Sequence, residues 1–201
     1  AGMASGKMID MSGEAEPVPD GDAAPSLSVV FVSQYFFPEQ FSLNAMAEDV
    51  VLRGHKLTVL TGVPNYGRES FFDGYSNRER LDEDWRGARV LRACSVARGK
   101  SRLRLLLNYL TFPITGTWMA YRRFRQRPDV IFVSLLSPIF QALPAIFLSW
   151  YHRVPLVYWV QDIWPESAIH TLRLRNRFAI SGLTAVCRWI FRRADLVLVQ
   201  S

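Results

Sequence analysis

The sequence predicts an α/β fold, a mostly parallel β-sheet covered by helices on both faces. Short, continuous apolar runs rich in β-branched and aromatic residues, at 28–33, 56–61 and 155–160, suit strands buried on both faces. Segments with helical spacing of apolar residues lie between such runs. Alternating strands and helices pack as a parallel sheet between helical layers. We therefore expect strand–helix repeats from residue 27 onward.

Length and composition suit one globular domain, or one domain and a fragment of another. The 201 residues are 49% apolar and 13% aromatic. Residues 1–26 are mostly Gly, Ala, Ser, Pro and acids and are expected to be a disordered tail without a signal peptide, so that the domain spans 27–201. Cys94 and Cys187 lack metal-site spacing and suggest free thiols in a reducing compartment.

The charge is unevenly distributed along the chain. The formal net charge is +6, but residues 1–26 hold one lysine and five acids, so the remaining chain is strongly basic. A basic body suggests an anionic partner, which could be a phosphate-bearing substrate, a membrane surface or nucleic acid. A solvated basic surface is the alternative. Nucleic acid is the least favoured partner, because no aromatic-basic readout motif accompanies the arginines.

The first strand leads into a loop, 34–44, and a helix that Gly54 should end. The transition at 33–45 is where such a unit offers backbone N–H groups to an anion, and Asn44 there is a candidate substrate-binding residue. The loop has no glycine fingerprint, so NAD binding is not expected. The second strand ends at a turn-rich segment in which Asn65 and Tyr66 suit sugar hydroxyls, with plain turn chemistry as the alternative.

Residues 98–127 follow a strand near 88–96 and allow two interpretations. A largely apolar stretch lies between basic ends, the second of which includes Arg122, Arg123 and Arg125. This pattern is typical of a helix in a membrane interface, which we favour; the alternative is a core-facing helix with solvated arginines.

Residues 130–152 contain no Asp, Glu, Lys or Arg, but a transmembrane helix is not expected there. A strand at 129–133 comes first, and Ser137-Pro138 reads as an N-cap followed by proline at the first helical position. Pro144, inside the segment, makes a single span awkward.

The strongest site candidate follows the strand at 155–160. Four polar or indole side chains gather where this strand should end, and Pro165 can open the next helix; the four are Gln161, Asp162, Trp164 and Glu166. Ligands of open α/β sheets bind outside the carboxyl ends of the strands. The alternatives are that Trp164 is core, that Glu166 complements a helix N-terminus, and that Asp162 is a cap or part of a buried ion pair. A helix near 180–191 and a strand at 194–201 complete the pattern.

Several segments, in this order, resemble the N-terminal half of a glycosyltransferase family 4 enzyme. They are Tyr35-Phe-Phe-Pro-Glu-Gln-Phe, Arg53-Gly-His-Lys-Leu-Thr-Val-Leu-Thr-Gly-Val-Pro-Asn-Tyr, Phe72-Asp-Gly-Tyr, Leu107-Asn-Tyr-Leu-Thr-Phe, Trp159-Val-Gln-Asp-Ile-Trp-Pro-Glu-Ser and Arg193-Ala-Asp-Leu-Val-Leu-Val-Gln-Ser. The subgroup most resembled comprises bacterial O-antigen and capsule sugar transferases, including N-acetylfucosamine-type transferases, and this implies a role in lipopolysaccharide or capsule assembly.

The resemblance implies a GT-B architecture of two Rossmann-like domains, of which 27–201 would be the acceptor-binding one. The second, donor-binding domain, with its paired-glutamate motif, has no counterpart here, so activity of the chain alone is not expected. A nucleotide-sugar would be the co-substrate, with no other cofactor and no metal, and transfer to a lipid-linked or polysaccharide acceptor would be retaining, as in a hexosyltransferase. The enzyme would be cytoplasmic and peripheral at the inner face of the membrane. Phe41-Ser42 replaces the paired glycines of many members.

The site residues follow from both lines of reasoning. We expect Asp162 to be catalytic, as a general base or by orienting the acceptor hydroxyl. The expected substrate-binding residues are Asn44, Asn65, Tyr66, Gln161, Trp164 and Glu166, and the expected membrane-surface residues are Arg122, Arg123 and Arg125. The competing function is a non-catalytic module that docks on a membrane or on a partner protein that carries a donor domain.

Overall fold

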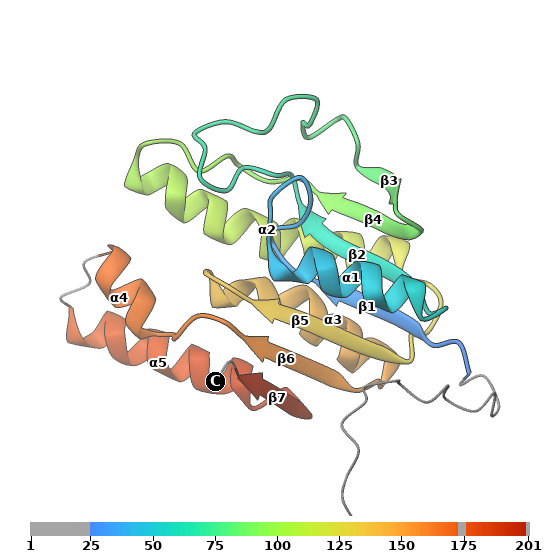
Figure 1. The fold of residues 1–201 in the computed structure, drawn as a ribbon. Helices are drawn as coiled ribbons and strands as arrows, with labels where there is room; N and C mark the ends of the chain where they lie inside the picture. The colour runs from blue at the N-terminus through green and yellow to red at the C-terminus, as the bar shows by residue number, and fades with distance from the viewer. Residues whose placement is uncertain (1–24, 173–175, 200–201) are drawn as a thin grey trace, which may run out of the picture.

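Seven strands form one sheet in the computed structural model of the chain, in the order β3-β4-β2-β1-β5-β6-β7. The structure describes residues 25–172 and 176–199, and Figure 1 shows their arrangement. All neighbouring strands run parallel except β3 and β4. The strands are β1 (Ser28–Val32), β2 (Lys56–Gly62), β3 (Asp82–Trp85), β4 (Ala88–Ala93), β5 (Val130–Leu135), β6 (Leu156–Val160) and β7 (Leu196–Val199).

Helices cover both faces of this sheet. They are α1 (Ser42–Leu52), α2 (Arg102–Arg123), the short 3-10 helix η1 (Ile139–Ala142), α3 (Leu143–His152), α4 (Glu166–Leu172) and α5 (Arg177–Phe191). In Figure 1, α1 lies in front of the sheet, and α2 and α3 lie behind it. The predicted fold class, a mostly parallel α/β sheet with helices on both faces, is confirmed.

Alternate residues of β1, β2, β4 and β5 contribute to two separate hydrophobic cores. In β1, Val30 and Val32 join a cluster with residues of α2, α3 and α5, whereas Val29 and Phe31 pack with α1. This alternation follows from the two-residue period of a strand. It also explains why β1 is apolar at nearly every position, since both of its faces are buried.

The predicted helix end at Gly54 is confirmed. Gly54 has a φ of +82°, and its N–H donates to the carbonyl oxygen of Val51 at 2.9 Å. Glycine enters this left-handed conformation at little cost, which is why it commonly follows the last helical turn.

Two details differ from the sequence prediction. The edge strand β3 was not expected, because its sequence Asp-Glu-Asp-Trp lacks the apolar signature of a buried strand. The helix predicted to start at Ser137-Pro138 begins instead as η1 after Pro138, and Pro144 lies in the first turn of α3. The Ser137 hydroxyl makes no cap there and turns toward Asp162.

Helix α2 reconciles the two interpretations of residues 98–127. One face packs into the core through Asn108, Phe112, Gly116 and Ala120. The opposite face leaves apolar side chains exposed, namely Leu103, Leu106, Leu107, Leu110, Ile114, Trp118 and Tyr121. The core-facing interpretation is confirmed, and a membrane role for the exposed face stays a prediction. Among the described residues, no helix has the length and apolarity needed to span a membrane.

Candidate functional site

A cavity of about 750 Å³ lies at the carboxyl ends of the parallel strands. Its walls come from loops that follow β2, β4, β5 and β6 and from the adjoining turns of α2 and α4. The lining residues are Tyr66, Arg98, Tyr109, Leu136, Ser137, Gln161, Asp162, Ile163, Glu166 and Ser167. Parallel α/β sheets bind ligands in this position. Four of the predicted site residues meet here: Tyr66, Gln161, Asp162 and Glu166.

Asp162 is held by two hydroxyl groups. Ser137 donates to its Oδ2, and Ser167 donates to its Oδ1. The Ser137 hydroxyl oxygen in turn accepts the indole N–H of Trp164 at 3.0 Å. Hydroxyl donors stabilise a charged carboxylate, and each carboxylate oxygen can accept a second hydrogen bond. The carboxylate is therefore oriented and able to bind a ligand hydroxyl.

Gln161 is anchored at the end of β6. Its backbone N–H donates to the Leu135 carbonyl oxygen at 3.0 Å, and its side-chain Nε2 donates to Ser134 Oγ at 2.5 Å. Both contacts join β6 to β5, so the side chain has a defined direction on the cavity wall. An anchored amide of this kind suits recognition of sugar hydroxyls, which both donate and accept hydrogen bonds.

An arginine and two tyrosines form another part of the wall. The guanidinium carbon of Arg98 lies 5.1 Å from the ring centroid of Tyr66 and 6.0 Å from that of Tyr109. Burial raises the pKa of Tyr109, nearby Arg98 opposes that rise and Asp162 adds to it. Tyr109 thus keeps its proton at neutral pH and lies within electrostatic reach of both charges. Sequence reasoning placed neither Arg98 nor Tyr109 in the site, because the two belong to a loop and a helix that meet the cavity only in the fold.

Glu39 is a buried carboxylate that ties together two of the loops at this edge of the sheet. Its Oε1 accepts the backbone N–H groups of Asn65, at 2.7 Å, and Tyr66, at 2.5 Å, and its Oε2 accepts that of Phe36 at 3.1 Å. Burial raises the pKa of Glu39 to about 7, against the lowering effect of these donors. Sequence reasoning missed this residue; the available signal was one acidic residue in an aromatic loop.

Asn65 supports the site without lining the cavity. It is 1% exposed; its Nδ2 donates to the Val63 carbonyl oxygen at 2.7 Å, and its Oδ1 accepts from Asn108 Nδ2 at 3.0 Å. Asn108 continues the network, since its Oδ1 accepts from Gln34 Nε2 at 3.1 Å. The amide of Asn65 thus makes its hydrogen bonds within the fold and supports the loop that carries Tyr66, while a substrate-binding role for it stays a prediction.

Asn44 and Trp164 also lie away from the cavity wall. The Nδ2 of Asn44 donates to the carbonyl oxygen of Glu39 at 2.7 Å, so this amide closes the first loop onto α1. Trp164 is 6% exposed and packs edge-to-face on Phe140, with ring centroids 5.8 Å apart. Its indole N–H reaches the site only through Ser137. The structure thus places both residues off the wall of this cavity, and a substrate-binding role for them stays a prediction.

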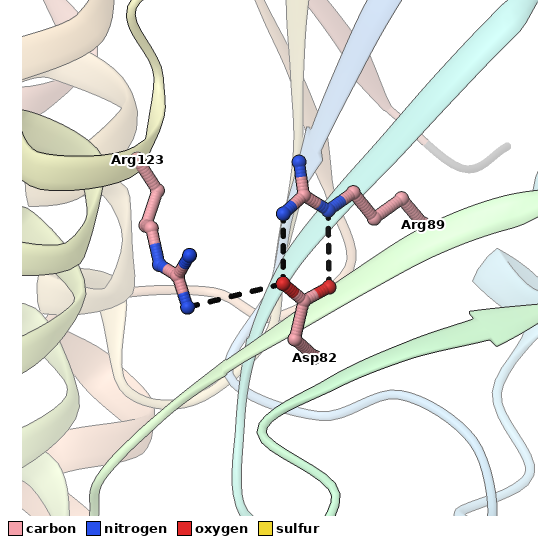
Figure 2. Close-up of polar contacts among 3 residues, drawn as sticks. All are labelled: Asp82, Arg89 and Arg123. Atoms are coloured by element: carbon pink, nitrogen blue, oxygen red, sulfur yellow. Dashed lines mark hydrogen bonds and ion pairs between the residues drawn. The ribbon is translucent and has the colours of Figure 1, made fainter.

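The three predicted membrane-surface arginines lie near the end of α2, where they are exposed but not equivalent. Arg122 lies over the Trp118 ring at 5.5 Å. Figure 2 shows that Arg123 points toward Asp82, with 3.8 Å between nitrogen and oxygen, while Arg89 makes two contacts with the same carboxylate. Arg125 lies beyond the helix end. Arg123 is thus partly committed to an ion pair that joins α2 to the β3–β4 edge.

Comparisons with known proteins bear on what this site does. Residues 41–201 match the model of a family described as "Glycosyl transferase 4-like domain". The crystal structure of CalG4, the calicheamicin glycosyltransferase, superposes with a TM-score of 0.51 at 13% sequence identity. The alignment covers 86% of this chain and 42% of that one, so this chain spans less than half the length of its structural relative. At this identity the similarity shows the fold alone. A comparison with curated protein sequences found no significant match. In the described parts of the chain, no three His, Cys, Asp or Glu side chains gather to hold a metal ion.

Proposed function

The chain belongs to the glycosyl transferase 4-like domain family, and from this membership we propose that it is the acceptor-binding half of a glycosyltransferase. The proposed reaction moves a hexose-type sugar from a nucleotide-sugar to a lipid-linked or polysaccharide acceptor, with retention of configuration and without a metal or further cofactor. The nucleotide-sugar would be bound by a second domain. The observation that carries the proposal is the cavity at the carboxyl ends of the strands, where an oriented carboxylate and amide meet.

The role proposed for Asp162 is to position the acceptor hydroxyl. Both of its carboxylate oxygens accept hydrogen bonds from serine hydroxyls, which fix the direction of the carboxylate on the cavity wall. A hydroxyl bound to this carboxylate would be oriented toward the donor sugar. In a retaining reaction the leaving phosphate of the donor can accept the proton, so Asp162 need not do so.

Asp162→Asn tests this role in an assay that supplies a donor-binding domain. Asparagine keeps the size of the side chain but lacks the negative charge, and one of its two serine contacts faces an amide nitrogen instead of an oxygen. We expect turnover to fall by about 10²-fold or more, with the melting temperature nearly unchanged. Gln126→Asn, a substitution at an exposed position after α2, is the control. Normal turnover in a folded Asp162→Asn variant would remove Asp162 from the reaction.

A second candidate function rests on the exposed apolar face of α2. This face, with Arg122 and Arg125 at its end, suits a module that docks on an anionic membrane, and we propose the same contact for the transferase at the inner face of the membrane. Its proposed place in O-antigen or capsule assembly rests on the sequence resemblance alone.

The membrane proposal is tested with vesicles of phosphatidylcholine and phosphatidylglycerol. Reversing the charges of Arg122 and Arg125 should weaken binding, since each basic residue near such a surface contributes about 1 kcal/mol. Arg123 is left intact because of its pair with Asp82. Arg78→Glu, at an exposed position in the loop before β3, is the control. Equal vesicle binding by all three proteins would make these arginines ordinary solvated surface.

A further inference from the structure

Arg98 is the cationic side chain on the cavity wall, and the fold holds it without neutralising it. Among the described residues, no carboxylate lies within ion-pair distance of its guanidinium. The rings of Tyr66 and Tyr109 lie beside it instead, at 5.1 and 6.0 Å. Aromatic rings attract a guanidinium and restrict its motion without neutralising its charge.

Neighbouring basic residues differ from Arg98 in their surroundings. Lys100 pairs with Glu69 at 3.3 Å. The side chain of Arg104 lies over Gly99, where an added Cβ would be 2.4 Å from its Cδ. Arg102, at the start of α2, is exposed and is not part of the cavity wall. Arg98 is therefore the cation of this segment that a ligand in the cavity would meet.

The donors around Arg98 suit a phosphate better than a single carboxylate. A guanidinium presents its N–H groups as a fork that can bind two oxygens of an oxyanion. Tyr109 adds a phenolic O–H on the same wall. Three donors from two side chains match the several oxygens of a phosphate group, whereas a carboxylate offers only two oxygens.

The cavity also separates its charges. Asp162 is already bonded to two serine hydroxyls, while Arg98 lies against the tyrosines. Both residues line the same cavity, and among the described residues no ion pair joins them. A ligand that carries a hydroxyl and a phosphate would place the hydroxyl at Asp162 and the phosphate at Arg98.

We infer that Arg98, held by Tyr66 and Tyr109, binds a phosphate group of the acceptor while an acceptor hydroxyl lies at Asp162. This inference rests on the proposed function and deepens it by naming the chemistry that the acceptor must carry. The phosphate could belong to a small sugar phosphate or to the head group of a lipid. The second source has a place beside the site, since an apolar groove of about 350 Å³ lined by Leu110, Leu183 and Val186 also touches Tyr109.

The test is direct binding to the whole chain by titration calorimetry at an ionic strength of about 0.15 M, where weak surface attraction is screened. The probes are glucose 1-phosphate and octyl phosphate, with glucose and octyl glucoside as phosphate-free partners. We expect Arg98→Gln to weaken both phosphate probes by about tenfold or more, in line with the loss of a charge-assisted hydrogen bond. Arg102→Gln, the matched control, should leave binding unchanged. Arg98→Lys keeps the charge but loses the fork, so its loss should be intermediate.

Equal phosphate binding by the wild type and Arg98→Gln would overturn the inference, as would an equal loss in Arg102→Gln or the absence of saturable phosphate binding to the wild type. Tighter binding of octyl phosphate than of both glucose 1-phosphate and octyl glucoside would assign the phosphate to a lipid; preference for glucose 1-phosphate would assign it to a small sugar. Thermal melting of each variant checks the fold. Because binding needs no donor, the inference can fail while sugar transfer is still observed, and a failure of transfer leaves the binding result intact.

Discussion

Replacing Glu39 by glutamine should remove a pH dependence of stability that the fold creates. Glu39 is 4% exposed, and burial raises its pKa from an ordinary 4.5 to about 7. The folded chain then binds this proton more tightly than the unfolded chain does. The stabilisation is complete below about pH 4.5 and is lost as the pH rises through about 7.

The magnitude follows from the two pKa values. Each pH unit between them lowers the free energy of unfolding by about 1.4 kcal/mol, so the full change is about 3 kcal/mol. Glutamine does not titrate and should show no such slope. Its Nε2 would also face the Phe36 N–H that Oε2 now accepts at 3.1 Å, which should make the variant about 1–3 kcal/mol less stable than the wild type at low pH. Because the wild type then loses about 3 kcal/mol as the pH rises through about 7, the difference in stability between the two proteins should shrink to about zero or reverse in sign.

Urea unfolding followed by tryptophan fluorescence at several values between pH 5 and 8 measures this difference. Contributions from the rest of the chain are the same in both proteins and cancel in the comparison. A difference that stays constant with pH would refute the raised pKa. A difference that grows with pH would show that the three N–H donors outweigh burial and hold the carboxylate charged.

Two further predictions concern packing and the amide network, and both are measured by chemical unfolding. Asn108→Leu should destabilise the fold by about 3 kcal/mol, because it leaves buried polar partners such as Asn65 Oδ1 unpaired. Leu107→Ala on the exposed face of α2 is the control and should change stability by less than about 0.5 kcal/mol. Gly116→Val should lower the free energy of unfolding by about 1–3 kcal/mol, because even a Cβ there would lie 3.0 Å from Pro144. Gly182→Ala, in open space on α5, should raise it by about 0.5–1 kcal/mol. A neutral Asn108→Leu or Gly116→Val would contradict these contacts.

Local patterns were enough to predict most of the strand and helix segments, though not β3, and to point to one edge of the sheet as the place of the candidate site. The apolar runs of β1, β2, β5 and β6 have both faces buried, so their composition alone identifies them. The sequence shows where the strands end, and this assigned four polar or aromatic residues to one edge of the sheet. The structure places all four on one cavity: Tyr66, Gln161, Asp162 and Glu166.

The sequence did not show in which direction each side chain near the site points or what surrounds it. Trp164 lies two residues from Asp162 but turns into the core, and Asn65 precedes Tyr66 but is used entirely within the fold. Adjacent residues in a loop can face opposite ways, and no period relates their directions. The choice depends on what packs against the loop.

Only the tertiary structure decided which distant segments complete the site. Arg98 and Tyr109 reach the cavity because the loop after β4 and the start of α2 pass over the ends of β5 and β6. Glu39 connects two loops at this edge of the sheet because its carboxylate accepts three backbone N–H groups from them. Apolar periodicity is a property of neighbouring residues, so the sequence reveals it directly. Convergence of polar groups depends on the order of strands in the sheet, which arises only when the whole chain packs.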